Sequence, residues 1–169
     1  MTQPDDAADD SLDYVAITRL QARYADVVNR RAWPELSSLF EPDAVIRVDT
    51  VTAPVRELPG PVALGEFIGA AIDRFDFFEF VILNRVIEVG VAGDPDVATG
   101  RVFMCEIRRD RSTEAFSVAF GVYHDEYRRA AARWWFAGRH YQSLARTEPP
   151  GAFPFPAVFD QFVREGPQP

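Results

Sequence analysis

The spacing of hydrophobic residues changes near Phe80 from a helical pattern to a run of strands, and this change limits the folds that the chain can adopt. After Gly60-Pro61 the spacing is that of one face of an α-helix, with apolar residues at Leu64, Phe67, Ile68, Ala71, Ile72 and Phe75. From Phe80 onward the pattern is that of strands separated by turns, at 80–89, 97–108, 115–127 and 133–145. Helices followed by a meander of strands predict an α+β fold, in which a bent, mostly antiparallel sheet wraps around the helices.

The N-terminal part is predicted to hold two more helices and one short strand. A long amphipathic helix is expected from Ser11 to about residue 29. Its apolar face carries Ala16, Leu20, Tyr24 and Val27. A short helix follows over about 34–40, because Pro34 fits the first turn of a helix. A strand over 44–48 and a loop over 49–60 complete this part, so three helices precede the main sheet.

The length of 169 residues fits one domain. We expect residues 1–10 to form a disordered acidic tail and residues 11–147 to form the domain. Residues 148–169 are rich in proline but also carry several phenylalanines, which is unusual for a free linker. This segment is therefore predicted to dock on the body, with a short helix over Ala157–Val163.

The composition excludes several classes of function. The formal net charge of −8 opposes binding to nucleic acids and to anionic membranes. All 18 basic residues are arginines, so no lysine can form a Schiff base or act as a general base. The single cysteine, Cys105, lies in an apolar run and is expected to be a core thiol.

No metal, cofactor or membrane association is expected. The sequence has no zinc-ligand spacing and no nucleotide-binding motif. The acidic N-terminus has no features of a secretory leader, and no apolar stretch is long enough to span a membrane. We therefore expect a cytoplasmic protein.

Several short motifs resemble a known family. The N-terminal motifs are Leu20-Gln21-Ala22-Arg23-Tyr24, then Trp33-Pro34-Glu35-Leu36 with Leu39-Phe40, and Glu41-Pro42-Asp43-Ala44. They resemble the opening helices and first turn of the SnoaL-like families of the nuclear transport factor 2-like superfamily, and the segments 123–129 and 135–139 resemble the last two strands of that fold. The resemblance spans about residues 12–146. It implies a cone-shaped α+β barrel, in which three helices close a bent sheet around a pocket for a small, mostly apolar molecule.

The catalytic dyad of several of these relatives is absent from this sequence. In the dehydratase and dehydrochlorinase relatives, an Asp just past the first helix orients a His that removes a proton from the substrate. The Asp position falls on Asn29, and the His position falls near Phe80. Phenylalanine cannot accept a proton and asparagine cannot neutralise an imidazolium, so this alignment excludes a His-Asp mechanism.

Other matching positions keep polar groups, and the resemblance implies that they are catalytic. Tyr24 stands where dehydratases point a tyrosine into the cavity. Glu106 stands near the position of a second carboxylate, and Arg139 matches an arginine that stabilises developing negative charge. A carboxylate buried near an apolar wall has a raised pKa, which suits proton abstraction near neutral pH.

Each of these three residues also has a purely structural interpretation. Tyr24 fits an ordinary half-buried core tyrosine, Glu106 a solvated or interfacial salt bridge, and Arg139 a surface arginine, because alternation alone does not say which strand face meets the cavity. The predicted substrate-binding residues are Asn29, Trp33, Phe80, Tyr123 and Tyr141. The small residues on the face of Tyr123 would leave space inside the sheet, although packing against a bulky helix explains them equally well; they are Ser117, Ala119 and Gly121.

The only two histidines, His124 and His140, are expected on the outer face of the sheet, at an interface or in solvent. Relatives usually dimerise through this face. Its apolar and aromatic residues are too many for one short C-terminal segment to cover, so we expect a homodimer.

Two functions are open at this point. The first is a cofactor-independent lyase, isomerase or cyclase that acts on a small hydrophobic or polyketide-like molecule without the His-Asp dyad. The alternative is a non-catalytic small-molecule-binding or accessory protein of the same fold. A polar cluster with a perturbed carboxylate inside the pocket would support the enzyme, whereas a wholly apolar pocket would support binding alone.

Overall fold

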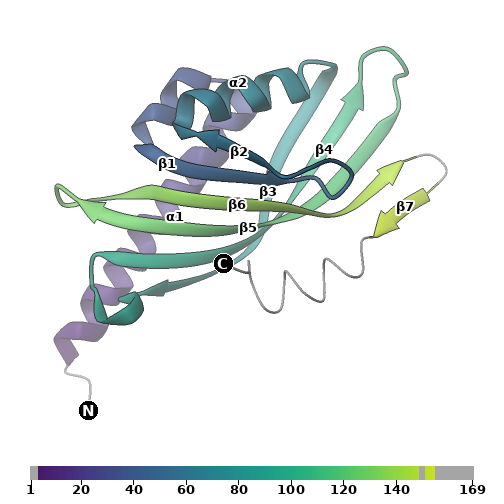
Figure 1. Ribbon diagram of the computed structural model, residues 1–169. Coiled ribbons are helices and arrows are strands. Elements are labelled where there is room, and N and C mark those ends of the chain that lie inside the picture. The colour runs from purple at the N-terminus through teal and green to yellow at the C-terminus, as the bar shows by residue number, and fades with distance from the viewer. Residues whose placement is uncertain (1–3, 149–150, 155–169) are drawn as a thin grey trace.

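The computed structural model describes residues 4–148 and 151–154, with the side chains of residues 11–147. In chain order the elements are α1 (Pro4–Arg30), η1 (Trp33–Ser38), β1 (Phe40–Asp49), β2 (Arg56–Pro59), α2 (Gly60–Ile72), β3 (Phe75–Val89), η2 (Val91–Gly93), β4 (Val97–Asp110), β5 (Phe116–Ala130), β6 (Arg133–Glu148) and β7 (Gly151–Pro154). Figure 1 shows their arrangement; η1 and η2 are 3₁₀ helices.

One sheet joins all the described strands in the order β2-β1-β6-β5-β4-β3, with β7 added to β6. Every pair is antiparallel except β1 with β6, which run parallel. Register shifts in β1, β3 and β6 bend the sheet, as bulges do. The edge strands β2 and β3 do not pair with each other within the described residues, so the sheet is a bent, open cone. The predicted α+β class and mostly antiparallel sheet are confirmed.

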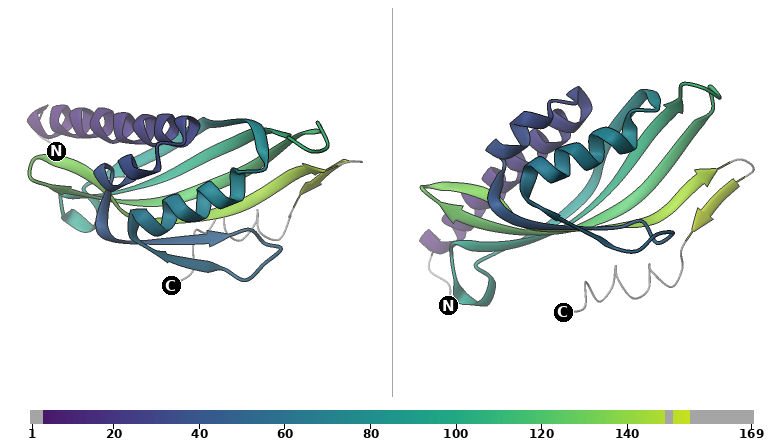
Figure 2. Two further views of the ribbon diagram at one scale, coloured as in Figure 1. Left: turned by 90° about the horizontal axis from the view of Figure 1, so that it is seen from above. Right: turned by 45° about the horizontal axis from the view of Figure 1, so that its top comes forward.

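The N-terminal helices lie together on one side of the sheet (Figure 2). α1 packs on β3 and β6, and α2 packs on η1 and β1. The core between these two layers includes Ile17, Leu36, Phe40, Ile46, Met104, Tyr127 and Phe136. Among the described residues, no helix is long and apolar enough to cross a membrane.

Several element boundaries differ from those expected. α1 begins at Pro4, so residues 4–10, expected to form a disordered tail, are helical. Phe75 begins β3 and does not belong to α2, and β2 lies within the expected loop 49–60, because 56–59 pair with β1. Residues 151–154 of the C-terminal segment pair with β6. The helix expected over Ala157–Val163 lies outside the described residues.

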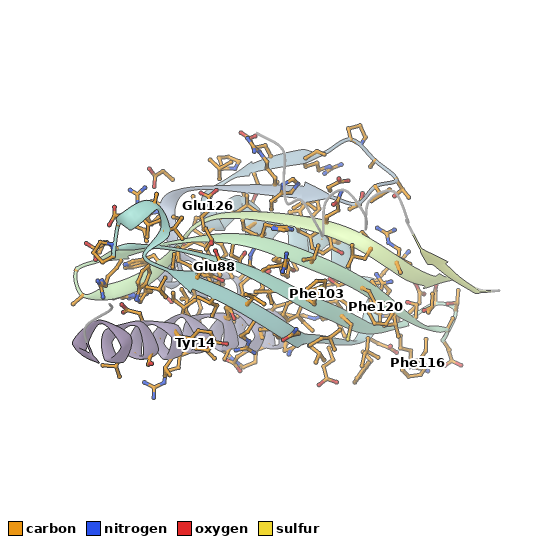
Figure 3. All side chains as sticks on the ribbon, turned by 90° about the horizontal axis from the view of Figure 1, so that it is seen from below. Tyr14, Glu88, Phe103, Phe116, Phe120 and Glu126 are labelled. Atoms are coloured by element: carbon orange, nitrogen blue, oxygen red, sulfur yellow. The ribbon has the colours of Figure 1, made fainter. Side chains whose placement is uncertain are left out.

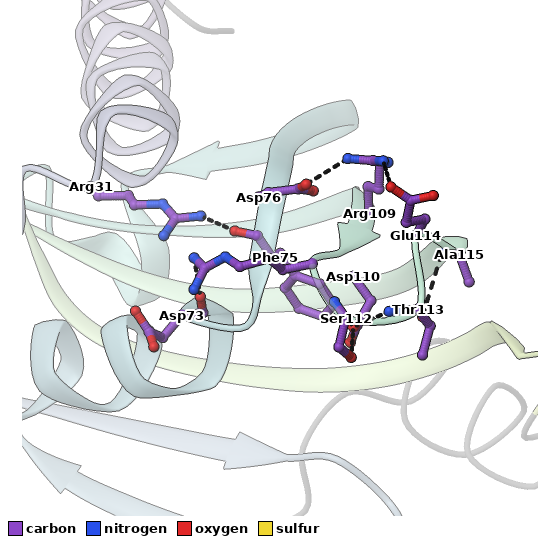
Figure 4. Close-up of polar contacts among 11 residues, drawn as sticks. Arg31, Asp73, Phe75, Asp76, Arg109, Asp110, Ser112, Thr113, Glu114 and Ala115 are labelled. Atoms are coloured by element: carbon purple, nitrogen blue, oxygen red, sulfur yellow. Dashed lines mark hydrogen bonds and ion pairs between the residues drawn. The ribbon is translucent and has the colours of Figure 1, made fainter.

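A hydrogen bond and an ion pair join the turn between β4 and β5 to the segment that connects α2 to β3 and to the start of β3 (Figure 4). The backbone N–H of Arg111 donates to the carbonyl oxygen of Arg74 at 3.0 Å, and Arg109 forms an ion pair with Asp76 at 2.5 Å. From the end of α1, Nη2 of Arg31 donates to the carbonyl oxygen of Phe75 at 2.7 Å. Two segments distant in sequence, the end of α1 and the turn between β4 and β5, therefore hold the start of β3 in place.

Candidate functional site

A cavity of about 150 Å³ lies between the helices and the concave face of the sheet. Its apolar wall comes mainly from α2, β1 and β3, and includes Ile46, Val48, Leu64, Phe67, Ile68, Ala71, Phe75 and Phe80. Its polar residues come from α1 and from β4 to β6, and include Tyr24, Glu106, Arg108, Tyr123, Arg139, Tyr141 and Arg146. The cavity is thus apolar on one side and polar on the other. The structure brings Tyr24, Glu106 and Arg139 together in it, along with the predicted binding residues Phe80, Tyr123 and Tyr141.

Arg139 is a buried cation with one hydrogen-bond donor unused. It lies on β6 opposite Asp125 of β5, and its Nε and Nη2 donate to the two Asp125 oxygens at 2.6 and 2.8 Å. The two side chains are 2% and 0% exposed. Nη1 of Arg139 has no hydrogen-bond partner among the described residues. A cavity-lining guanidinium with a free N–H is suited to hold a ligand oxygen.

Aromatic rings and Asp125 fix the position and charge of Arg139. Its Cζ lies 4.1 Å from the ring centres of both Tyr24 and Tyr123, and 4.5 Å from that of Phe136. Burial lowers the pKa of Arg139, but the Asp125 carboxylate outweighs this, and the pKa is raised above its ordinary value. The guanidinium therefore stays protonated and cannot act as a base.

Asp125 itself is held by a chain of hydrogen bonds. The Tyr127 hydroxyl donates to Oδ2 of Asp125 at 2.8 Å, and Nε2 of Gln21 donates to the Tyr127 oxygen at 2.6 Å. Sequence reasoning missed Asp125. The available signal was its position two residues after Tyr123, which places both side chains on one face of a strand.

Glu106 points toward the cavity from β4. Phe103 and Cys105 occupy the opposite face of that strand, as Figure 3 shows for Phe103. The Glu106 side chain is 22% exposed, and its Oε2 lies 3.6 Å from Nη1 of Arg108. Burial raises the pKa of Glu106, although the charges of Arg108 and Arg146 oppose the rise. This carboxyl group can therefore take up and release a proton closer to neutral pH than an exposed glutamate.

The cavity tyrosines are neutral donors. Burial raises the pKa of Tyr24, against the lowering effect of the Arg139 charge. Burial also raises the pKa of Tyr123 well above its ordinary value; the Arg139 charge lowers it and the Glu106 charge raises it further. On β5, Tyr123 lies between Ala119, which pairs with Glu106, and Asp125, which pairs with Arg139.

Two predicted substrate-binding residues, Asn29 and Trp33, do not line the cavity. Oδ1 of Asn29 accepts from the Phe80 backbone N–H at 2.6 Å, and its Nδ2 donates to the Phe80 carbonyl oxygen at 3.0 Å. Trp33 packs against Gly65 and Gly69 of α2, where an added Cβ would come within 3.1 and 3.2 Å of it. In this structure both side chains hold elements together, and neither is among the residues that line the cavity.

We expect Asn29→Ala to reduce the free energy of unfolding by about 1–3 kcal/mol, since both polar groups of Phe80 lose their side-chain partner. Asn29→Asp keeps the acceptor for the Phe80 backbone N–H and should reduce the free energy of unfolding by less. Urea denaturation followed by circular dichroism measures both values. If Asn29→Ala were as stable as the unmodified protein, this structural role would be disproved.

Sequence reasoning also missed Arg108 and Arg146. The Arg108 side chain is only 13% exposed and lines the cavity. The signal was the alternation of β4, which places Arg108 on the same face as Glu106. Among the described residues, no group of His, Cys, Asp and Glu could hold a metal ion.

The outer face of the sheet carries a second, wider hollow of about 580 Å³. His124 and His140 face each other in register on β5 and β6 and line this hollow, on the face where they were expected. Glu88 and Glu126 lie on the same face (Figure 3). Burial lowers the pKa of His140, and the Asp49 charge opposes this. We place the candidate site in the inner cavity, because the buried guanidinium and the perturbed carboxyl group meet there.

The comparisons with known proteins agree with this architecture. The family model of the SnoaL-like domain matches residues 9–140. No curated protein matches the sequence. The crystal structure of LinA is 21% identical with a TM-score of 0.72, and the alignment covers 88% of this chain and 97% of that chain.

Two further solved structures show the same fold. The hexachlorocyclohexane dehydrochlorinase LinA-type3 from Novosphingobium barchaimii is 20% identical, with a TM-score of 0.68 over 88% of this chain and 94% of that chain. An NTF2-like protein with a cystatin-like fold from Novosphingobium aromaticivorans is 22% identical, with a TM-score of 0.63 over 78% and 82% of the two chains. Because the family match runs from α1 into β6 and so includes most of the cavity, this chain belongs to the family of SnoaL-like domains.

Proposed function

We propose that this protein is a cofactor-independent lyase or isomerase that forms an enolate from a small carbonyl compound bound in the inner cavity. The observation that carries the proposal is the free Nη1 of buried Arg139 in the same cavity as Glu106. A fixed cation with a free donor stabilises negative charge on oxygen, and a buried carboxylate with a raised pKa removes protons. Both halves of an enolisation step are thereby present.

In the proposed reaction, Glu106 takes the proton from the carbon next to the substrate carbonyl. The electron pair of the broken C–H bond forms the enolate, whose oxygen accepts from Nη1 of Arg139 and from the Tyr24 hydroxyl. Return of the proton at another carbon completes an isomerisation, and departure of a leaving group completes an elimination. An enolate also attacks a second carbonyl, so cyclisation of a polyketide-like chain falls within the same chemistry.

Glu106 is the strongest candidate for the base. Arg139 stays protonated, and the raised pKa values of Tyr24 and Tyr123 make them poor bases near neutral pH. The dyad positions offer no base either, because neither the amide of Asn29 nor the ring of Phe80 accepts a proton near neutral pH. The name of the dehydrochlorinase among the structural neighbours, which denotes an elimination, is in keeping with a lyase.

Proton exchange tests the proposal without knowledge of the natural substrate. Small cyclic ketones are incubated with the protein in D₂O, and loss of the α-proton signals is followed by NMR. The proposal expects exchange that is faster with the protein and that depends on Glu106. Binding of the ketones without any exchange would favour the alternative of a binding or accessory protein.

We also propose that the protein is a homodimer that packs through the outer face of the sheet. Exposed apolar side chains on β1, β3 and β5 support this; they are Val45, Leu83, Val86, Phe116 and Phe120. Light scattering at micromolar concentration should give about twice the chain mass of 19.0 kDa. A monomer at that concentration would contradict the proposal.

The cytoplasmic location expected from the sequence stays a prediction.

A further inference from the structure

We propose that the substrate is an anion: a small cyclic compound whose carboxylate binds Arg108 and Arg146 at one end of the inner cavity. The inference rests on the proposed function, because it takes the same cavity as the substrate site. It adds the chemical class of the substrate, which enolisation alone leaves open.

The first argument is the balance of charge. The cavity is lined by three arginines and one glutamate, although the chain as a whole carries a net charge of −8. Asp125 neutralises Arg139 through two hydrogen bonds. Glu106 can offset only one of the two arginines that remain, Arg108 and Arg146. Among the described side chains, one positive charge is therefore left over in this partly buried site, and an anionic ligand would balance it.

The second argument is the unsatisfied hydrogen bonding of Arg108. Its Nε is buried and has no hydrogen-bond partner among the described residues. Its contact with Glu106, at 3.6 Å, is longer than the roughly 2.7–2.9 Å of a charge-assisted hydrogen bond. Burial lowers the pKa of Arg108, and the nearby charge of Arg146 lowers it further. A carboxylate between the two guanidinium groups would satisfy the donor and relieve their repulsion.

The third argument is the order of the charged groups. Along β5, the cross-strand partners of Arg139, Glu106 and Arg108 are Asp125, Ala119 and Ser117, in that order. Glu106 therefore lies between the Arg139 end of the cavity and the Arg108 end. A substrate with its carbonyl oxygen at Arg139 and its carboxylate at the other end presents the intervening C–H group to Glu106.

The size of the cavity limits the substrate to about one ring. A cavity of about 150 Å³ is of the size that holds benzene in an apolar protein interior. Phe75, over which Arg108 lies at 5.2 Å from the ring centre, forms part of the apolar wall. Benzoate is therefore a suitable probe, and benzamide is its neutral counterpart of nearly the same shape.

Calorimetric titration of the full chain with both probes tests the inference. We expect benzoate to bind at least about tenfold more tightly than benzamide, the size of effect that a charge-assisted hydrogen bond gives. Arg108→Met and Arg146→Met should each remove about tenfold of the benzoate affinity and leave benzamide unchanged. The matched control is Arg128→Met. Arg128 is an exposed arginine of β5 outside the cavity, so this substitution should change neither the benzoate affinity nor the benzamide affinity. Thermal melting confirms that each variant is folded.

Glu106→Gln should change the benzoate affinity in the opposite direction, from weaker to tighter binding. It removes the negative charge that competes for the two arginines, so benzoate should bind several-fold more tightly even though catalysis is lost. Equal affinity for benzoate and benzamide, absence of benzoate binding, or weaker benzoate binding in Glu106→Gln would each overturn the inference. The proposed function would survive those results if ketone exchange were still observed. Tight benzoate binding without any exchange would instead leave the anion site standing and contradict the proposed function.

Discussion

Asp125→Ala is expected to reduce the free energy of unfolding by about 3–5 kcal/mol. The substitution leaves the Arg139 charge buried with no counter-ion, and loss of one partner of a buried ion pair has a cost of this size. The Tyr127 hydroxyl loses its acceptor as well. Because domains of this size are stable by only about 5–15 kcal/mol, a large part of the total stability is at stake. Urea denaturation followed by circular dichroism measures the loss.

Two controls separate the buried charge from other effects. Asp26→Ala removes one partner of an exposed ion pair with Arg30 on α1 and should reduce the free energy of unfolding far less than Asp125→Ala does. The double variant Asp125→Leu with Arg139→Met replaces both charges by apolar groups and should recover most of the stability lost by Asp125→Ala alone. A single variant as stable as the unmodified protein would show that Arg139 does not depend on Asp125. Arg139→Met by itself is a poor test of catalysis, since it leaves Asp125 buried and unpaired.

Glu106→Gln should slow the α-proton exchange of ketones by about 100-fold or more. The amide has the size of the carboxyl group but cannot accept the proton, and loss of a positioned base has an effect of this order. The matched control is Glu88→Gln, an exposed glutamate on the outer face of the sheet, which should exchange ketones at the unmodified rate (Figure 3). Full activity of Glu106→Gln would show that another group is the base.

The raised pKa of Glu106 also determines how activity and stability depend on pH. Activity should fall as the pH drops through this raised pKa, because the protonated carboxyl group cannot act as the base. Stability changes in the opposite direction: the folded protein binds this proton more tightly than the unfolded chain, whose glutamate titrates near 4.5. The contribution of Glu106 to stability is therefore full below that value and is lost as the pH rises through the folded pKa. Glu106→Gln should accordingly be more stable than the unmodified protein at pH 8 and show little difference at pH 4.

The sequence predicted the fold well where a local pattern was sufficient. Pro34 and Gly60-Pro61 mark the starts of η1 and α2, and the alternation after Phe80 marks the long strands. The predicted element boundaries are wrong where tertiary contacts determine the secondary structure. The segment 56–59 is a strand only because β1 pairs with it, and Phe75 continues the helical spacing of α2 although it begins β3.

The candidate site could be predicted only in part. The resemblance to the family indicated Tyr24, Glu106 and Arg139, and the structure places all three around one cavity. Alternation puts Asp125 on the strand face of Tyr123, but the sequence does not say which face meets the cavity. That depends on the register of β5 and β6, for Asp125 and Arg146 alike, and a shift of one residue would reverse the face of each side chain. Asn29 was placed beside Phe80 by the alignment, and it does contact Phe80, but through the backbone rather than in the cavity.

The parallel pairing of β1 with β6 also has a consequence for folding kinetics. Asp49 and Gln142, which are hydrogen-bonded across this pair, are 93 residues apart in the chain. Closing a loop of that length costs chain entropy before the contacts form, so refolding is expected on the millisecond-to-second scale of proteins rich in long-range strand pairs. During synthesis, β1 is made long before its parallel partner β6, so the N-terminal half stays incomplete until the strand that carries Arg139 has been made.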